Sequence, residues 1–140
     1  MQTLQADYLV AGAGTTGMAF TDALIAESDA SVVLVDRRDA PGGHWNDAYP
    51  FVRLHQPSAF YGVNSVHLGC DRIDQSGLNA GYYEQATGGE ICQYFQQVLE
   101  KVLLPSGQVT FLGRSRARGA GPQRPQAGVK LRRGRVGACP

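Results

Sequence analysis

The stretch that decides the fold is residues 7–36, which read DYLVAGAGTTGMAFTDALIAESDASVVLVD. By composition, residues 8–11 form a short buried strand, residues 15–27 have helical character, and residues 31–35 are rich in the β-branched valine that suits a sheet. Three glycines follow the first strand in GxGxxG spacing: Gly12, Gly14 and Gly17. This order of strand, glycine-rich loop, helix and strand predicts a β-α-β unit with a phosphate-binding loop.

Each glycine has its own role in such a loop. Gly12 permits the tight turn out of the strand, Gly14 lets the backbone approach a pyrophosphate without a Cβ in the way, and Gly17 allows close packing of the helix on the strand. The helix N-terminus adds unpaired N–H groups and about half a positive charge. A glycine-rich turn that binds no nucleotide is the alternative, and it is disfavoured because the neighbouring elements agree with the loop. Thr15 and Thr16, in the same turn, complete the expected contacts.

Asp36 follows the second strand at about the 20-residue distance typical of a ribose-binding acid. Its carboxylate would accept hydrogen bonds from the hydroxyl groups of an adenosine ribose. A negative charge there repels a 2′-phosphate, which favours an unphosphorylated ribose. Arg37 and Arg38 keep NADP open as an alternative, since guanidinium groups bind phosphate.

Residues 36–45 read DRRDAPGGHW, in which a second glycine pair, Gly42 and Gly43, stands directly before His44 and Trp45. This segment resembles the "acid, basic residues, then Gly-Gly-x-Trp" segment of FAD-dependent oxidoreductases of the flavin-containing monooxygenase type, in the two-dinucleotide-binding flavoprotein superfamily. In that family the segment runs beside the ribose and pyrophosphate of FAD. The resemblance implies that Gly43, His44 and Trp45 contact FAD, with a plain core position as the alternative for Trp45.

The resemblance continues, more loosely, through residues 48–68. Family members place a comparable polar segment near the flavin ring, which implies His55 or Gln56 as a contact of the isoalloxazine. Pro50 and Pro57 disfavour helix in the residues before them and predict an extended loop. Apart from His67 and Cys70 at i+3, the three histidines have no His or Cys partner at i+3 or i+4, so we expect no metal site.

A second helix is predicted from Thr87, which forms a T-x-x-E capping box with Glu90. Apolar residues recur behind it at helical spacing: Ile91, Tyr94, Phe95, Val98, Leu99, Val102 and Leu103. Pro105 and Gly107 end the helix, and residues 109–112 are predicted as the next parallel strand. The fold class is therefore α/β, a Rossmann-like β-α-β unit with a parallel sheet that is incomplete.

Residues 113–140 carry seven arginines and Lys130, while all 12 acidic residues precede them. This composition predicts two parts: residues 1–112 as a partial FAD-binding Rossmann-like domain, and residues 113–140 as a disordered basic tail rich in arginine, glycine and proline. A basic arm for nucleic acid or an anionic membrane is an alternative, but the tail has no aromatic residue and no motif. The same bias suits a frame-shifted GC-rich reading frame, and we take a truncated or frame-shifted product of a longer flavoprotein gene as a hypothesis.

Composition limits the remaining possibilities. No apolar run approaches the roughly 20 residues of a membrane span, and the amino terminus has no secretory pattern, so a cytoplasmic protein is expected. Three cysteines occur without a CxxC pair, at Cys70, Cys92 and Cys139, and predict neither a disulfide framework nor a redox-active pair.

The predicted function is the FAD-binding portion of an NAD(P)H-dependent flavoprotein oxidoreductase or monooxygenase. FAD is the expected cofactor, and NAD(P)H is implied for the full-length family. With 140 residues the chain is short for an FAD domain, a nicotinamide domain and a substrate site together. The alternatives are a non-catalytic nucleotide-binding fragment and an NAD(P)-binding Rossmann domain. The sequence leaves the substrate and the oligomeric state open.

Overall fold

The structure, a computed structural model, describes residues 3–117. Its helices and strands follow in the order β1 (Tyr8–Ala11), α1 (Thr15–Glu27), β2 (Val32–Val35), α2 (Gly88–Val98) and β3 (Val109–Leu112). Short 3-10 turns occur at Gly43–Asp47 (η1), Ser58–Phe60 (η2) and Leu104–Ser106 (η4), and a π-helical turn, Leu99–Leu103 (η3), extends α2. Among the residues described, no helix is long and apolar enough to cross a membrane.

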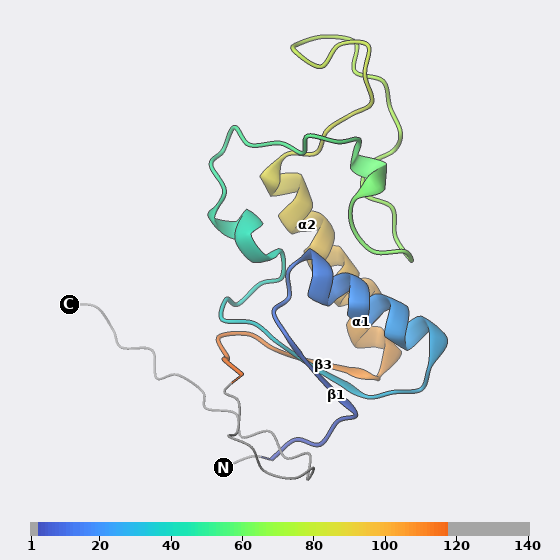
Figure 1. Ribbon diagram of the computed structural model, residues 1–140, viewed down its shortest axis with the longest axis vertical. Coiled ribbons are helices and arrows are strands. Elements are labelled where there is room, and N and C mark those ends of the chain that lie inside the picture. Colours follow the sequence, from blue (N-terminus) through green and yellow to red (C-terminus); the bar gives the residue numbers. More distant parts are fainter. Residues whose placement is uncertain (1–2, 118–140) are drawn as a thin grey trace, which may run out of the picture.

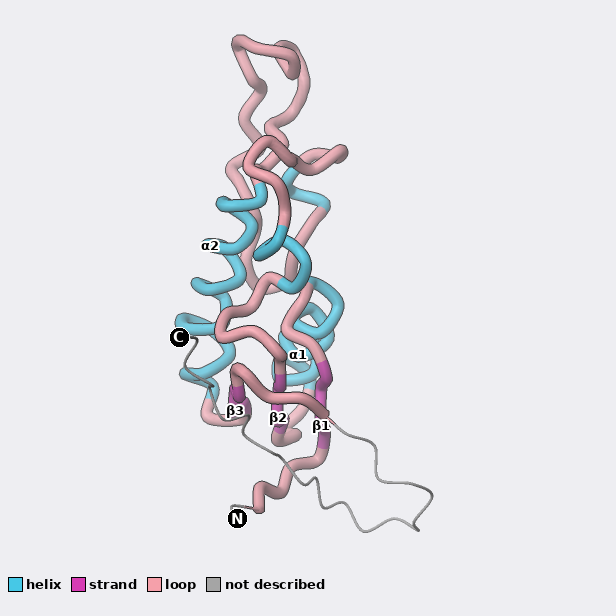
Figure 2. Tube along the Cα trace, turned by 90° about the vertical axis from the view of Figure 1, so that its left-hand side faces the viewer, coloured by secondary structure: helices cyan, strands magenta, loops and turns pink. Residues whose placement is uncertain are grey.

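The three strands form one parallel sheet in the order β1-β2-β3 (Figure 2). In this register Leu34 of β2 lies between Val10 of β1 and Phe111 of β3. Both crossovers run in the same direction across the sheet, so right-handed connections place α1 and α2 on the same face. The predicted α/β class with a Rossmann-like parallel sheet is confirmed.

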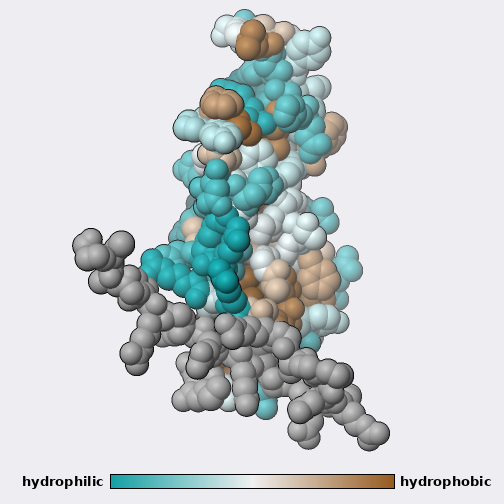
Figure 3. Space-filling model, turned by 60° about the vertical axis from the view of Figure 1, so that its left-hand side comes forward, coloured by the Kyte–Doolittle hydropathy of each residue, from teal (hydrophilic) through white to brown (hydrophobic). Residues whose placement is uncertain are grey.

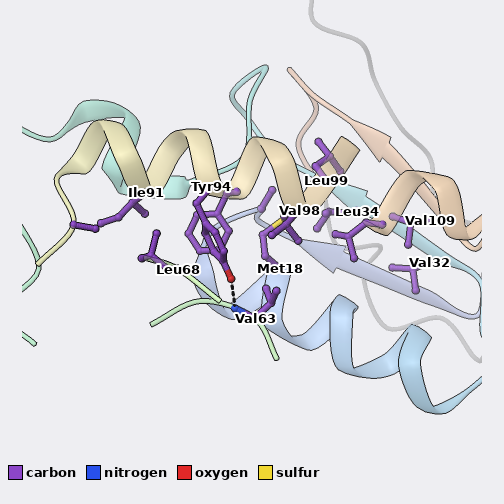
Figure 4. Packing of buried hydrophobic residues seen from close by; sticks show 14 of the residues in the cluster. Met18, Val32, Leu34, Val63, Leu68, Ile91, Tyr94, Val98, Leu99 and Val109 are labelled. Atoms are coloured by element: carbon purple, nitrogen blue, oxygen red, sulfur yellow. Dashed lines mark hydrogen bonds between the residues drawn. The ribbon is translucent and has the colours of Figure 1, made fainter. Parts of the chain in front are cut away.

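The core lies between this face of the sheet and the two helices (Figure 4). Leu34 contributes from the sheet, Met18 from α1, and Phe95 and Val98 from α2, and each is fully buried. A buried side chain of this size stabilises the fold by about 1.5 to 3 kcal/mol, which explains why α2 needs the sheet beneath it.

The second helix begins as predicted. Thr87 is the N-cap of α2, its backbone N–H donates to Glu90 Oε2 at 2.7 Å, and Glu90 N–H donates to Thr87 Oγ1 at 3.3 Å. The predicted apolar stripe faces the core, since all its members but the half-buried Val102 are buried. The winding changes after Val98 to a π turn and then to a 3-10 turn that contains Pro105.

The long connection between β2 and α2 is tied to the helices by buried polar groups. The Tyr94 hydroxyl accepts a hydrogen bond from Val63 N at 2.8 Å, drawn in Figure 4, and donates to Val66 O at 2.6 Å. Asp22 of α1 is 2% exposed and accepts hydrogen bonds from the backbone N–H and the hydroxyl of Ser65. These contacts hold residues 61–66 over the N-terminal half of α1 (Figure 1).

The expectation that residues 8–11 form a buried strand is wrong. Tyr8 and Leu9 are 45% and 37% exposed, because β1 is an edge strand of the described sheet, whereas all four residues of the central β2 are buried. Tyr8 packs edge-on against Phe20, itself 47% exposed. Figure 3 shows one face of the molecule, which is largely hydrophilic with separate apolar patches.

The folded part extends slightly past the predicted boundary at residue 112. Ser115 is buried and its backbone N–H donates to Asp36 O at 2.8 Å, while Arg114 N–H donates to Arg38 O at 3.0 Å. Residues 113–115 therefore pack on the end of β2. The remainder of the predicted tail, from residue 118, lies outside the described residues, as does Cys139.

Candidate dinucleotide-binding site

Two of the three loop glycines are required by the fold itself. Gly12 has a φ of +108°, a backbone conformation that residues other than glycine rarely adopt. A Cβ on Gly17 would lie 1.9 Å from the carbonyl oxygen of Gly12, so the first turn of α1 packs directly on the loop backbone. The expected roles of Gly12 in the turn and of Gly17 in helix packing agree with this geometry.

Gly14 is different, because no contact within residues 3–117 requires a glycine there. It is the N-cap of α1 with an ordinary φ of −82°, and a Cβ would lie 3.6 Å from Gly43 Cα, a normal van der Waals contact. The bare backbone therefore presents an open approach in front of the helix. A pyrophosphate that needs close contact with this backbone fits such a cradle.

The N-terminus of α1 is free of side-chain caps. The first α-helical hydrogen bond runs from Met18 N to Gly14 O at 2.9 Å, and in the described part of the chain no side chain accepts from the first turn. The backbone N–H groups of Thr15, Thr16 and Gly17 precede that bond and carry the positive end of the helix dipole. This arrangement favours an anion next to Gly14.

The second glycine pair packs against this loop. Gly42 N–H donates to Ala13 O at 2.8 Å, and a Cβ on Gly43 would lie 2.9 Å from Gly14 Cα. Gly42 and Gly43 have φ values of +113° and +56°. The structure thus brings Gly43 to the phosphate loop, and His44, the next residue in η1, is exposed.

Asp36 is 5% exposed and its carboxylate is bonded to the loop. Oδ2 accepts from Ala13 N at 2.7 Å, and Oδ1 accepts from Arg38 N at 2.8 Å. A carboxylate can accept about four hydrogen bonds, so each oxygen keeps a lone pair for a ribose hydroxyl. Asp36 therefore holds the loop in shape and remains able to accept from a ligand.

The two arginines after Asp36 differ in their surroundings. Arg38 forms an ion pair with Asp47, and this hydrogen bond raises the pKa of the guanidinium and lowers the pKa of the Asp47 carboxyl. Arg37 is exposed to solvent. The guanidinium of Arg38 is thus directed to a carboxylate of η1.

Trp45 lies between the site and α2. Its indole packs against Gly88 at the start of α2, where a Cβ would be 3.5 Å from Trp45 Cε3, and its Nε1–H donates to the Tyr61 hydroxyl at 2.6 Å. The Tyr61 hydroxyl is also hydrogen-bonded to Thr15 Oγ1, in the first turn of α1. The sequence analysis did not single out Tyr61, because a lone tyrosine in a long loop has no spacing that marks it.

His55 and Gln56 are both exposed to solvent, and within the described residues no hydrogen bond joins either side chain to the phosphate loop. Gln56 Nε2 donates to Phe60 O at 3.3 Å, and the residue that joins this segment to the phosphate loop is Tyr61. Contact of His55 or Gln56 with a flavin ring stays a prediction. A separate hollow lies beneath residues 69–86 and is lined by Arg53, Arg72, Glu84 and Glu90 among others, away from the glycine loop.

Comparison with known proteins finds a family model that matches a segment in the N-terminal half of the chain. Residues 10–68 match the model of the NAD(P)-binding Rossmann-like domain. This segment includes the phosphate loop, Asp36 and both glycines of the second pair.

Relatives occur in mycobacteria. Uncharacterized proteins of Mycobacterium bovis and Mycobacterium tuberculosis are 57% identical over 129 residues, which is 92% of this chain and 24% of the relatives. The chain thus spans about a quarter of their length. The hypothesis of a truncated or frame-shifted product stays a prediction.

The fold is found in solved flavoproteins. A flavin-containing monooxygenase from Stenotrophomonas maltophilia matches with a TM-score of 0.66 and 20% identity over 93% of this chain and 34% of its own. A closed crystal structure of cyclohexanone monooxygenase matches with a TM-score of 0.54 and 24% identity over 83% of this chain and 20% of its own. The chain is a nucleotide-binding Rossmann domain with the fold of the corresponding part of these enzymes, as the resemblance in sequence implies.

Proposed function

We propose that this nucleotide-binding Rossmann domain, similar in fold to flavin-containing monooxygenases, binds FAD and forms the FAD-binding portion of an NAD(P)H-dependent flavoprotein oxidoreductase or monooxygenase. One observation carries the proposal: the open backbone at Gly14, in front of an uncapped helix N-terminus, with the Asp36 carboxylate fixed behind the same loop. The similarity in fold to the flavin-containing monooxygenase named above supports the flavin assignment.

The residues of this chain would bind and orient the ADP half of the cofactor. Backbone N–H groups of the first turn of α1 donate to the pyrophosphate, and the bare Gly14 lets the phosphate oxygens come close. Asp36 accepts from the ribose hydroxyls through the lone pairs that Ala13 and Arg38 leave free. A 2′-phosphate would meet this buried carboxylate, so the site favours FAD or NAD over NADP.

The second glycine pair favours FAD over NAD. Gly43 packs on Gly14 and begins the turn that carries His44 and Trp45, which extends the polypeptide along one side of the phosphate loop. In the proposed complex this segment runs beside the pyrophosphate towards the flavin. Bound FAD supplies the redox chemistry, and the described residues supply its binding and orientation.

Calorimetric titration of the purified 140-residue chain with FAD, ADP, NAD and NADP tests the proposal. We expect FAD to bind more tightly than NAD, and NAD more tightly than NADP. The variant Gly14→Ala is titrated in parallel, because it should bind every phosphate-containing ligand more weakly while it keeps the fold.

Two outcomes would replace the proposal. Tighter binding of NAD than of FAD would favour a plain NAD(P)-binding Rossmann domain. Binding of ADP with no preference for FAD over NAD or NADP would favour a non-catalytic nucleotide-binding fragment.

A further inference from the structure

We propose that Tyr61 is a positioning residue for the pyrophosphate: its hydroxyl, held by Trp45, directs the hydroxyl of Thr15 as a hydrogen-bond donor towards a phosphate oxygen. The inference rests on the proposed function, because it assigns a role at the same loop. Tyr61 lies 44 or more residues along the chain from every glycine of the first loop, and the tertiary structure alone brings its side chain to that loop.

The first step fixes the direction of one hydrogen bond. The indole Nε1–H of Trp45 can only donate, so the Tyr61 oxygen is the acceptor of the 2.6 Å bond between them. The tyrosine ring is held by edge-on contacts with Trp45 and Phe95, at centroid distances of 6.1 and 6.2 Å. The hydroxyl of Tyr61 therefore sits in one place, between the indole and Thr15.

The second step counts donors. Trp45, Tyr61 and Thr15 have one donor hydrogen each, and two hydrogen bonds join the three groups. One hydroxyl hydrogen is therefore left over, and among the described residues neither hydroxyl donates it to another acceptor. Thr21, further along α1, is the contrast, since its hydroxyl donates back to Gly17 O at 2.8 Å.

The third step decides which hydrogen is free when an anion is bound. If Tyr61 donates to Thr15, the free hydrogen belongs to Thr15, the first residue of α1 after the open Gly14. A phosphate oxygen next to the helix N-terminus would select this arrangement, because a hydrogen bond to an anion is stronger than one between neutral groups. Donation from Trp45 through Tyr61 also polarises the Thr15 hydroxyl and strengthens its bond to the phosphate.

A double-mutant cycle on the full chain tests whether Tyr61 acts through Thr15. The variants are Tyr61→Phe, which keeps the ring, Thr15→Val, which keeps the shape, and the two combined, with Thr15→Ser as the conservative control. ADP and adenosine are the ligands, since only ADP has a pyrophosphate. Urea unfolding followed by the emission of Trp45, the only tryptophan, checks that each variant is folded.

We expect each single variant to bind ADP about ten- to a hundredfold more weakly, as for the loss of one hydrogen bond to a charged group, with adenosine affinity unchanged. The double variant should be no weaker than Thr15→Val alone, and Thr15→Ser should bind like the wild type. The role of Tyr61 is overturned if Tyr61→Phe binds ADP normally, if its effect persists in the Thr15→Val background, or if adenosine is weakened equally. A wild-type chain that binds neither ADP nor FAD overturns the proposed function as well, so the two failures are distinguishable.

Discussion

Exchange of single glycines for alanine should separate the binding role of the phosphate loop from its structural role. At Gly14 a methyl group would have 3.6 Å to its nearest neighbour, and the φ of −82° suits alanine. Alanine is a poorer N-cap than glycine, which destabilises the fold by about 0.5 to 1 kcal/mol. Alanine also makes the unfolded chain less flexible, which stabilises the fold by about 0.4 to 1 kcal/mol. The free energy of unfolding of Gly14→Ala should thus lie within about 1 kcal/mol of the wild type.

Gly17→Ala is the matched structural variant. Its methyl group would lie 1.9 Å from the oxygen and 3.1 Å from the carbon of the Gly12 carbonyl, and these backbone atoms cannot move aside as a flexible side chain would. Overpacking of this kind costs about 1 to 3 kcal/mol, and a rigid backbone contact belongs at or above the upper value. Urea unfolding should therefore show a clear loss of stability for Gly17→Ala.

Stability should be reduced more by Gly17→Ala, whereas ligand affinity should be reduced strongly by Gly14→Ala. A methyl group on Gly14 would occupy the space that the pyrophosphate needs, and a comparable steric cost corresponds to about ten- to a hundredfold weaker binding. Calorimetric titration with ADP and FAD measures this effect directly. Wild-type affinity in a stable Gly14→Ala variant would refute the placement of the pyrophosphate, and wild-type stability of Gly17→Ala would refute the described contact between α1 and the loop.

Three further predictions concern the polar groups that support the fold. Tyr94→Phe should lower the free energy of unfolding by about 1 to 3 kcal/mol in urea titrations, because the buried N–H of Val63 loses its acceptor. Asp36→Asn should cost a similar amount, about 1 to 3 kcal/mol, since an amide oxygen replaces only one of two acceptors for backbone N–H groups; unchanged stability would contradict the hydrogen bonds described. The N–H of Cys70 is the main cause that lowers the pKa of Glu84, so the stabilisation is present above the ordinary glutamate pKa of about 4.3 and is lost as the pH falls through the lowered value. Hydrogen exchange at the Cys70 amide should accelerate over that acidic range in the wild type, and Glu84→Gln should lack this pH dependence.

Local sequence pattern was sufficient for the regular elements. The helical character of residues 15–27 predicted α1 at the bounds observed, and the run of valines predicted β2 to within one residue. The T-x-x-E box predicted the start of α2, and residues 109–112 form the third strand as expected. These features depend on neighbours within a few residues, where backbone sterics and capping bonds decide the conformation. The exposure of Tyr8 was missed because it depends on which strand occupies the edge of the sheet, a property of topology.

The glycine motif by itself identified the phosphate loop, since the turn, the close helix contact and the free helix N-terminus follow from residues within six positions of one another. Only the tertiary structure decided how much room is left at Gly14, because the distance from Gly14 to Gly43 depends on how two separate segments pack. It also decided that Tyr61 meets Thr15 and Trp45. A hydrogen bond between side chains far apart in the chain leaves no periodic trace in the sequence, because loop packing, and not local conformation, brings its partners together.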